Sequence, residues 1–576
     1  MDGQDKYSFG EISTADFWSS TLLSRLSQAE TCSPEYTATL RDERAAVASL
    51  LLILDARINA CAPVSRLPPE VMGTIFSYLL GQERHERIEV TGHVSRTVPW
   101  IRLTHVCRHW RQVFLNNAAL WRHIVLPLPP KWSEVIVERS QLAPLVITCS
   151  PERKKKEKSP PVQLPVATLE RVQHIDTWGY EGSHIGLAQL LRTPAPILEV
   201  AHLNNVAATG LFADSAPRLR VLKMSGEGDA FPWTTSFLPN LITLSLSSIY
   251  GSNTSVAQFI AGLRRLSRIQ TLSLLDCLET FSSAAQLPTA SQMVSLPSLR
   301  TLSISGALLG CVGFLRHVQA PDTFTLYVTT HAHRVSEFAV LYPFLAPPRG
   351  YGADPFRAIQ FSTKGLCDIA VTARHADHGS PSRVFSFRWL LNRPDTLVDA
   401  IRALCEEMGV RELRSLSMDL GAGKNGPLLS PTMWLDEFGA AADLQELQAT
   451  GTAGATLCTV LSASMEDGTW QRTGAARGDI LWPRLSELKL EGVPLAHCFT
   501  RVDGVEEGDE AFGVSVGEVL LRELGRRQQR GAQLKKLKLI RCGATGQWLR
   551  KAEDLVGCVS ARGDEDASQS EESGGA

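Results

Sequence analysis

Three short motifs contain residue types that could carry out chemistry. The segment "GVSVG" at 513–517 has the G-x-S-x-G spacing of a hydrolase nucleophile elbow, with Ser515 in the position of the nucleophile. That chemistry requires a buried strand before the serine and a helix after it. The helical sequence "EVLLRELGRR" follows, but the preceding "RVDGVEEGDEAF" is acidic and lacks the apolar core of a strand. We therefore do not expect Ser515 to be a nucleophile.

The other two motifs suggest a phosphate-binding loop and a metal site. "GAGKNG" at 421–426 contains the Gly-Lys pair of a phosphate loop, but Met418 stands in place of the first glycine and Asn425 in place of the magnesium-binding Ser or Thr. His375 and His378 in "RHADH" have a metal-like spacing, but no cysteine or carboxylate motif accompanies them. We expect surface loops at both places, and therefore a chain that is not an enzyme and has no metal or cofactor.

The composition indicates a globular protein of several domains or one long repeat array. The chain has 576 residues, of which 44% are hydrophobic and 20% charged. Its net charge of −2 provides no global basic field, so we expect no nucleic-acid partner. The longest apolar run, "AVASLLLIL" at 46–54, is too short to cross a bilayer, so we expect no membrane partner.

The cysteines and the N-terminus indicate an intracellular protein. Twelve cysteines are scattered singly with no CxxC pair, which argues against a zinc module and a disulfide framework. The first ten residues, "MDGQDKYSFG", do not have the pattern of a signal peptide. The basic run "PERKKKEKSPP" at 151–161 favours a solvated loop over a nuclear import signal. We expect a cytoplasmic or nuclear location, or both.

A leucine-containing phrase occurs nine times along the chain. Its inner L-x-L alternates with period two, which predicts a short strand with one buried face. Helical or irregular segments separate the phrases, and a strand with a helical return every 20–30 or so residues predicts an irregular, leucine-rich-repeat-like α/β solenoid. Cys277 and Cys542 lie three residues past the last strand leucine, where we expect them to bond loop backbone. The nine phrases are "ILEVAHLNN", "PRLRVLKMSG", "PNLITLSLSS", "SRIQTLSLLDC", "PSLRTLSISG", "RELRSLSMDL", "DLQELQATG", "PRLSELKLEG" and "QLKKLKLIRC".

The segment "SRLPPEVMGTIFSYLL" at 65–80 has a different pattern. Two prolines and Glu70 favour a helix start, and an apolar face follows on about three turns. A second helix is predicted over 101–115, followed by a turn, a short third helix that ends at Trp121, and a strand. Three small helices in so few residues make a marginal core, which a bound partner would complete.

These residues resemble the F-box. The match is formed by Leu67-Pro68-Pro69-Glu70, the Ile75-Phe76…Leu79 stripe, Val106-Cys107…Trp110 and Leu120-Trp121. Together with the helix predicted over 36–60 and the leucine-containing phrases, the whole chain resembles the F-box proteins of basidiomycete fungi. The loop at 81–100 is longer than in a compact F-box, which puts the docking geometry in question.

The resemblance implies a substrate-recognition adaptor of a Skp–cullin–F-box ubiquitin ligase. The F-box would dock on a Skp-type adaptor, which links to a cullin and a RING subunit, and the repeat domain would capture the target protein. Carried over by position, the residues entering the adaptor are Leu67, Pro68, Ile75, Phe76 and Leu79, and those shaping a second face are Val106, Cys107 and Trp110. The identity of the target is not predicted.

Two alternatives stay open. The same apolar residues could form an internal core against the helix at 36–60, whose seam is Leu40, Val47, Leu51, Leu54 and Ile58. The chain could also be a non-catalytic scaffold with no ligase link. The predicted organisation is a disordered N-terminus at 1–33, a helix at 34–62, an F-box-like domain at 63–126, a repeat domain at 127–545 with an irregular insertion near 330–410, and an acidic disordered tail at 546–576.

Overall fold

The computed structural model divides the chain into two compact units. One comprises residues 1–124 and 128–143, and the other comprises 125–127 and 144–576. We describe each unit by itself. The structure describes residues 13–26, 34–86, 101–126, 130–149, 164, 166–177, 191–226, 231–249, 254–282, 289, 292–321, 324–331, 356–363, 368–374, 384–390, 396–420, 429–461, 463–466, 469–471, 479–499 and 511–562.

The first unit is helical. A helix lies within the N-terminal segment that we expected to be disordered, so the expectation for 1–33 is wrong over that stretch. The elements of this unit are α1 (Thr14–Leu26), α2 (Pro34–Cys61), η1 (Pro63–Arg66), α3 (Pro69–Glu86), α4 (Ile101–Thr104), α5 (Arg108–Asn116), η3 (Ala118–Trp121) and α6 (Pro130–Arg139), with strand β1 (His123–Leu126) at the boundary.

Helix α2 has its apolar seam exposed. No residue of α2 is buried, and Leu51 and Ile58 are 55% and 69% exposed. The alternative in which this seam packs against the apolar residues of the F-box-like segment is therefore not realised in the described residues. The core of the three small helices forms without α2, as described below.

The second unit contains most of a 17-stranded sheet. Neighbouring strands pair in parallel, except that β13 is antiparallel to both of its neighbours. In order of pairing, the strands are β2 (Leu145–Cys149), β3 (Val172–Asp176), β4 (Val200–Asn204), β5 (Val221–Ser225), β6 (Thr243–Ser247), β7 (Thr271–Leu275), β9 (Thr301–Ala307), β11 (Thr325–His331), β14 (Val384–Leu390), β13 (Asp368–Arg374), β12 (Ala358–Ser362), β15 (Ser415–Asp419), β16 (Glu446–Thr450), β20 (Glu487–Glu491), β21 (Lys536–Ile540) and β22 (Val559–Arg562).

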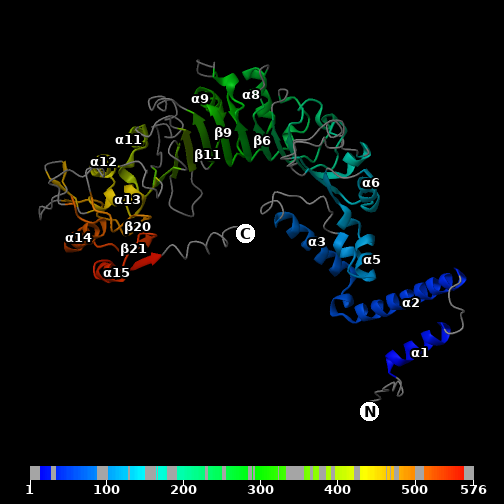
Figure 1. The fold of residues 1–576 in the computed structure, drawn as a ribbon. Helices are drawn as coiled ribbons and strands as arrows, with labels where there is room; N and C mark the ends of the chain where they lie inside the picture. Colours follow the sequence, from blue (N-terminus) through cyan, green and yellow to red (C-terminus); the bar gives the residue numbers. More distant parts are fainter. Residues whose placement is uncertain are drawn as a thin grey trace, which may run out of the picture. The chain divides into compact units, whose positions relative to one another are not determined.

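Helices and short turns connect these strands. Figure 1 shows β6, β9 and β11 in one sheet, in which β7 lies between β6 and β9, with α8 and α9 on one side of it. The helices are α8 (Val256–Arg265), α9 (Leu308–Leu315), α11 (Thr396–Met408), α12 (Pro431–Phe438), α13 (Gly451–Cys458), α14 (Val516–Gln529) and α15 (Gly546–Glu553). The 3-10 turns are η4 (Val166–Arg171), η5 (Leu211–Asp214), η6 (Leu238–Asn240), η7 (Glu279–Phe281) and η10 (Val410–Glu412). Two smaller sheets consist of β8 (Val294–Ser295) with β10 (Val318–Gln319), and of β17 (Ser464–Glu466) with β18 (Thr469–Gln471) and β19 (Asp479–Ile480).

All nine leucine-containing phrases form strands of this sheet, as predicted. In a typical strand such as β6, Leu244 and Leu246 are buried, whereas Thr243, Ser245 and Ser247 are only partly buried. The period-two alternation therefore places the leucines on one face, where they form the core. We call the opposite face, which carries the partly buried residues, the open face.

The residue that follows four of the strands, β4, β6, β7 and β21, has an unusual backbone conformation. Asn205, Ser248, Asp276 and Arg541 have φ between 51° and 55°, in the left-handed region. Their amide groups donate to a carbonyl at the end of the next strand, as in Asn205 N to Ser225 O at 2.8 Å. The ladder therefore extends one residue past these four strands, which offsets part of the strain of a non-glycine residue in this conformation.

Cys277 and Cys542 lie just beyond these turns and bond backbone, as predicted. The Cys277 thiol donates to Leu275 O at 3.0 Å and to Leu246 O, on the preceding strand, at 3.4 Å. The Cys542 thiol makes the matching pair with Ile540 O and Leu490 O. Each cysteine thus ties its turn to the neighbouring strand.

The insertion near 330–410 adds strands to the same sheet. The chain leaves β11, runs up β12, returns along β13, and places β14 beside β11. Helix α11 then leads to β15, which pairs with β12. This excursion explains why the repeat period fails here, because three strands pair before the regular connection resumes.

The C-terminal boundary that we predicted is wrong. Residues 546–562 contain helix α15 and strand β22, and β22 pairs in parallel with β21. Thr545 caps α15 by accepting from Trp548 N at 3.3 Å, and the Trp548 indole donates to Gly517 O at 2.9 Å. The acidic end at 563–576 lies outside the described residues.

None of the helices in the described ranges is both long enough and apolar enough for a membrane crossing.

Candidate functional site

The three small helices share an aromatic core. The ring of Phe76, on α3, lies 5.0 Å from the ring of Trp110 and 6.0 Å from that of Phe114, both on α5. Phe114 in turn lies 5.6 Å from Trp121 on η3, whose indole donates to Phe114 O at 3.0 Å. The same core buries Met72, Leu80, Val113 and Leu120. Edge-to-face and tilted ring pairs of this kind stabilise a small core beyond the area that they bury.

Helix caps fix the ends of the short elements. Cys107 precedes α5, and its sulfur accepts from Trp110 N at 3.5 Å. Asn117 precedes η3 and accepts from Ala119 N at 3.1 Å. A side chain at Gly73 would meet the Asn117 amide at 2.4 Å, so glycine at this position allows α3 to approach η3. Such caps satisfy amide groups that short helices would otherwise leave unpaired.

A second row of apolar residues on α3 stays exposed. Val71, Ile75 and Leu79 are 44%, 38% and 40% exposed, and Tyr78 is 67% exposed. Their spacing of four, three and one residues places all four on one side of the helix, next to the buried row of Met72, Phe76 and Leu80. We call this exposed row the docking face; Val106, 55% exposed before α5, is a further exposed apolar residue of the unit.

The eight predicted contact residues differ in exposure: four are exposed, three are half-buried and one, Phe76, is buried. Ile75, Leu79 and Val106 are exposed apolar residues, and Pro68 is exposed at the start of α3. Leu67, Cys107 and Trp110 are half-buried, and Cys107 and Trp110 contribute to a cap and to the core.

Phe76 requires a correction. It is 1% exposed and is enclosed by the aromatic core, so it belongs to the interior of the unit and not to its surface. Tyr78 is the residue that sequence reasoning missed: it follows Ile75 by three residues on the docking face. Helical spacing alone would have found it, had the stripe been divided into two rows.

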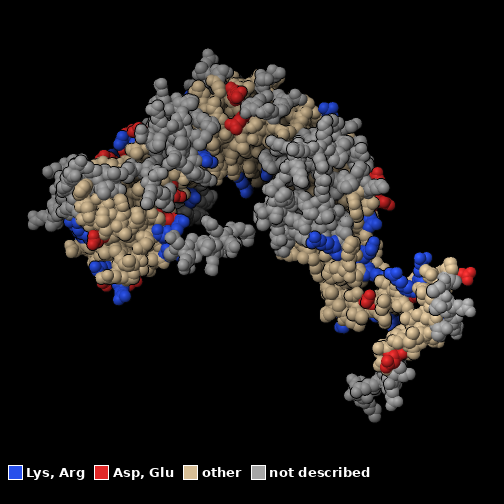
Figure 2. All heavy atoms as spheres, viewed as in Figure 1, with Lys and Arg blue, Asp and Glu red and all other residues tan. Residues whose placement is uncertain are grey.

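Basic residues occur around the same helices. Arg66, Arg102, Arg108 and Arg111 are all exposed. Figure 2 shows Lys and Arg side chains gathered over the part of the chain around α5, at the lower right. An apolar face accompanied by positive charge favours a partner whose surface is apolar at the centre and acidic at the edge.

Of the three motifs considered for catalysis, the structure describes only the segment around Ser515. The Ser515 hydroxyl caps α14: it bonds to Glu518 Oε2 at 3.0 Å and accepts from Glu518 N at 3.3 Å. Ser515 is thus committed to a helix start, and no nucleophile elbow forms there. The candidate loop 421–426 and the two histidines at 375 and 378 lie outside the described residues.

Two lysine residues of β21 on the open face form ion pairs with a glutamate of β20. Lys538 lies 2.6 Å from Glu487, and Lys536 lies 3.7 Å from the same carboxylate. These contacts lower the pKa of Glu487, chiefly through the hydrogen bond from Lys538. Part of the positive charge of these lysines is therefore balanced within the sheet.

Comparison with known proteins agrees with the helical geometry. Residues 64–127 match the family model of the F-box-like domain, which covers the helices from η1 to η3 and strand β1. A search of the curated proteins found no match. The chain therefore has a helical N-terminal region with an F-box-like domain, followed by an α/β region of parallel strands and helices. An F-box-like domain suggests the role of a ubiquitin-ligase adaptor, because F-box domains in general bind Skp-type adaptors and are typically non-catalytic.

Proposed function

We propose that this protein is a substrate-recognition adaptor of a Skp–cullin–F-box ubiquitin ligase, acting in the cytoplasm or nucleus. The F-box-like domain docks on a Skp-type adaptor, and through it on cullin and RING subunits. The leucine-rich-repeat-like region then presents its open face or the adjoining turns to the target protein. The exposed apolar row of α3, within the matched domain, is the observation that carries the proposal.

The docking face exposes apolar side chains to water, which is unfavourable and would be relieved by binding a partner. Val71, Ile75, Tyr78 and Leu79 leave apolar area in contact with water although the neighbouring row is fully buried. Contiguous exposed apolar residues mark protein-binding sites, and their burial stabilises a complex by about 25 cal/mol per Å² of apolar surface. The rigid aromatic core beneath holds α3 in place, which limits the entropy lost when a partner binds.

Co-expression with a Skp-type adaptor, followed by affinity purification, tests this proposal. The test variant is Ile75→Ala/Leu79→Ala, which removes two apolar side chains from the docking face. The matched control is Leu51→Ala/Ile58→Ala, which removes the same two residue types from the exposed seam of α2. We expect the wild type and the control to retain the adaptor, and the test variant to bind it at least about tenfold more weakly.

The second candidate is a scaffold that binds a protein partner with no ligase link. It would be favoured if the wild-type chain, shown to be folded by circular dichroism, failed to retain the adaptor. Equal retention by the wild type and the docking-face variant would instead move the contact away from α3. The two results are distinguishable. Loss of retention by the wild type would contradict the ligase function, whereas equal retention by the variant would contradict only the assignment of the contact to α3.

A further inference from the structure

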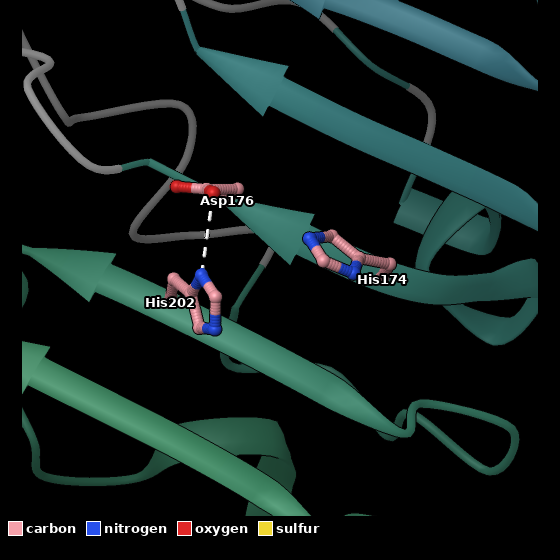
Figure 3. A group of neighbouring side chains, drawn as sticks. All are labelled: His174, Asp176 and His202. Atoms are coloured by element: carbon pink, nitrogen blue, oxygen red, sulfur yellow. Dashed lines mark hydrogen bonds and ion pairs between the residues drawn. The ribbon is translucent and has the colours of Figure 1, made fainter. Parts of the chain in front are cut away.

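Two histidines and an aspartate meet on the open face of the sheet in the second unit. His174 and Asp176 lie on β3, with Ile175 between them buried on the opposite face. His202 lies on β4, between the buried Ala201 and Leu203. The strand register places Asp176 directly opposite His202 and His174 diagonally across from it. All three side chains therefore project from the same face (Figure 3).

The donor atoms of these residues are close enough to share one ion. Asp176 Oδ2 lies 3.2 Å from His202 Nδ1, and the two imidazole rings lie 5.6 Å apart at an angle of 69°. One ligand atom from each residue lies within 4.8 Å of those of the other two. Donors bound to a tetrahedral zinc ion at about 2.0–2.2 Å are about 3.4 Å apart, so the separation of the Asp176 and His202 donor atoms is close to that of two zinc ligands.

The chemistry of the donor set favours zinc over calcium or magnesium. Two imidazole nitrogens and one carboxylate oxygen suit Zn²⁺, whereas Ca²⁺ and Mg²⁺ prefer six or more oxygen ligands. We propose that His174, Asp176 and His202 bind a zinc ion that joins strands β3 and β4. Three protein ligands leave a fourth position directed away from the sheet, which a water molecule or a donor group of a bound target can occupy. This proposal does not depend on the assigned ligase function.

The surroundings allow an ion to enter but oppose its charge. The side chains of His202 and Asp176 are 20% and 32% exposed, so the site is partly shielded and still reachable from solvent. On the other side of His202, β5 places Lys223 at the paired position of the open face. The lysine charge repels a divalent cation, so its removal must strengthen zinc binding. If His202 and Asp176 form only a hydrogen bond and no metal site, removal of the lysine charge should not change zinc binding.

Zinc titration of the full-length protein, freed of metal by dialysis against a chelator, tests the site. We expect one zinc ion per chain to bind in competition with a chromophoric chelator. His202→Gln and Asp176→Asn should each weaken this binding at least about tenfold. His497→Gln is the control, because His497 is exposed and lies far along the chain from the site. Lys223→Met should tighten binding by about threefold to tenfold.

Equal zinc binding by the wild type and the His202→Gln variant would overturn the proposal. Should either ligand variant fail to fold, the wild type alone decides the question. Modification of histidines by diethyl pyrocarbonate, located by mass spectrometry, would be measured with and without zinc. Protection of His174 and His202 but not of His497 supports the site, and equal modification of all three in both conditions refutes it.

Discussion

Ile75 and Phe76 are neighbours in the chain and serve opposite purposes in the fold. Phe76 is 1% exposed and packs against Trp110 and Phe114, whereas Ile75 is 38% exposed on the docking face. A rotation of about 100° per residue along the helix separates the two side chains. One row of α3 holds the F-box-like domain together, and the next row is available to a partner.

This division predicts different effects for truncation at the two positions. Phe76→Ala should lower the free energy of unfolding by about 3–5 kcal/mol, because it removes the ring that joins α3 to α5 and leaves a cavity. Ile75→Ala should lower it by less than about 1 kcal/mol, because the side chain is already exposed. Chemical denaturation of both variants measures the difference. Equal losses of stability would show that the two rows do not differ in burial.

The exposed arginines near the docking face predict a salt-dependent association. Reversing charge with Arg108→Glu/Arg111→Glu should slow association with a Skp-type adaptor by about threefold to tenfold at low salt, because long-range attraction steers encounter. The difference should shrink as the salt concentration rises, since the ions screen exposed charges. Surface plasmon resonance at two salt concentrations measures the association rates of the wild type and the variant. A reduction of the same size at high salt would point to a local contact and not to steering.

Four buried or half-buried cysteines of the second unit predict a protection pattern for thiol reagents. Burial raises the pKa of Cys277 to about 11 and that of Cys311 to about 12, and it also raises the pKa of Cys405 and Cys458. Because the thiolate is the reactive form, these residues should resist iodoacetamide at pH 8, while the exposed Cys61, Cys498 and Cys558 react. Mass spectrometry of the alkylated peptides tests the order.

The same pKa shifts give a sign for the dependence of stability on pH. A thiol whose pKa is higher in the folded state than in the unfolded state stays protonated longer when folded. Its contribution to stability is fully present below about pH 9 and is lost as the pH rises through about 11 for Cys277. Thermal unfolding between pH 8 and 11 should therefore show a falling melting temperature, with a smaller fall in a Cys277→Ala variant. An equal fall in both proteins would contradict the assignment.

Arg527, on α14, is a buried charged residue whose hydrogen bonds join α14 to two other segments of the chain. It is 0% exposed, and its guanidinium donates to Leu461 O at 2.8 Å, Leu481 O at 2.7 Å and Trp482 O at 2.6 Å. Arg527→Met would leave three buried carbonyls without these donors, so we expect the free energy of unfolding to fall by about 3 kcal/mol or more. Arg550→Met, at an exposed position on α15, should change it by less than about 0.5 kcal/mol. Urea denaturation compares the two variants.

Burial also lowers the pKa of Arg527, to about 10. Desolvation disfavours the charged form, and the three carbonyl acceptors compensate only in part. Retention of the charge with Arg527→Lys should recover part of the stability lost in Arg527→Met, since an ammonium group can still reach some of the acceptors. No recovery would show that the planar fork of the guanidinium is essential.

The sequence by itself determined the local structure of both units. The L-x-L alternation predicted all nine strands, because a period of two requires no knowledge of the partner strand. The prolines, Glu70 and the apolar spacing predicted the position of α3 for an equally local reason. The backbone hydrogen bonds of Cys277 and Cys542 were predicted from the position of each cysteine three residues past the last strand leucine.

Tertiary structure decided which residues meet. A broad apolar stripe on α3 does not reveal which row the aromatic rings of α5 and η3 will cover, so Phe76 was misplaced and Tyr78 was missed. His174, Asp176 and His202 come together only because β3 and β4 pair in a register that places Asp176 opposite His202, 26 residues further along the chain, and no local pattern contains that pairing. Helix α15 and strand β22 exist because β21 offers β22 a partner and Trp548 of α15 can bond Gly517. Local periodicity specifies the elements, and the long-range contacts between them specify the sites.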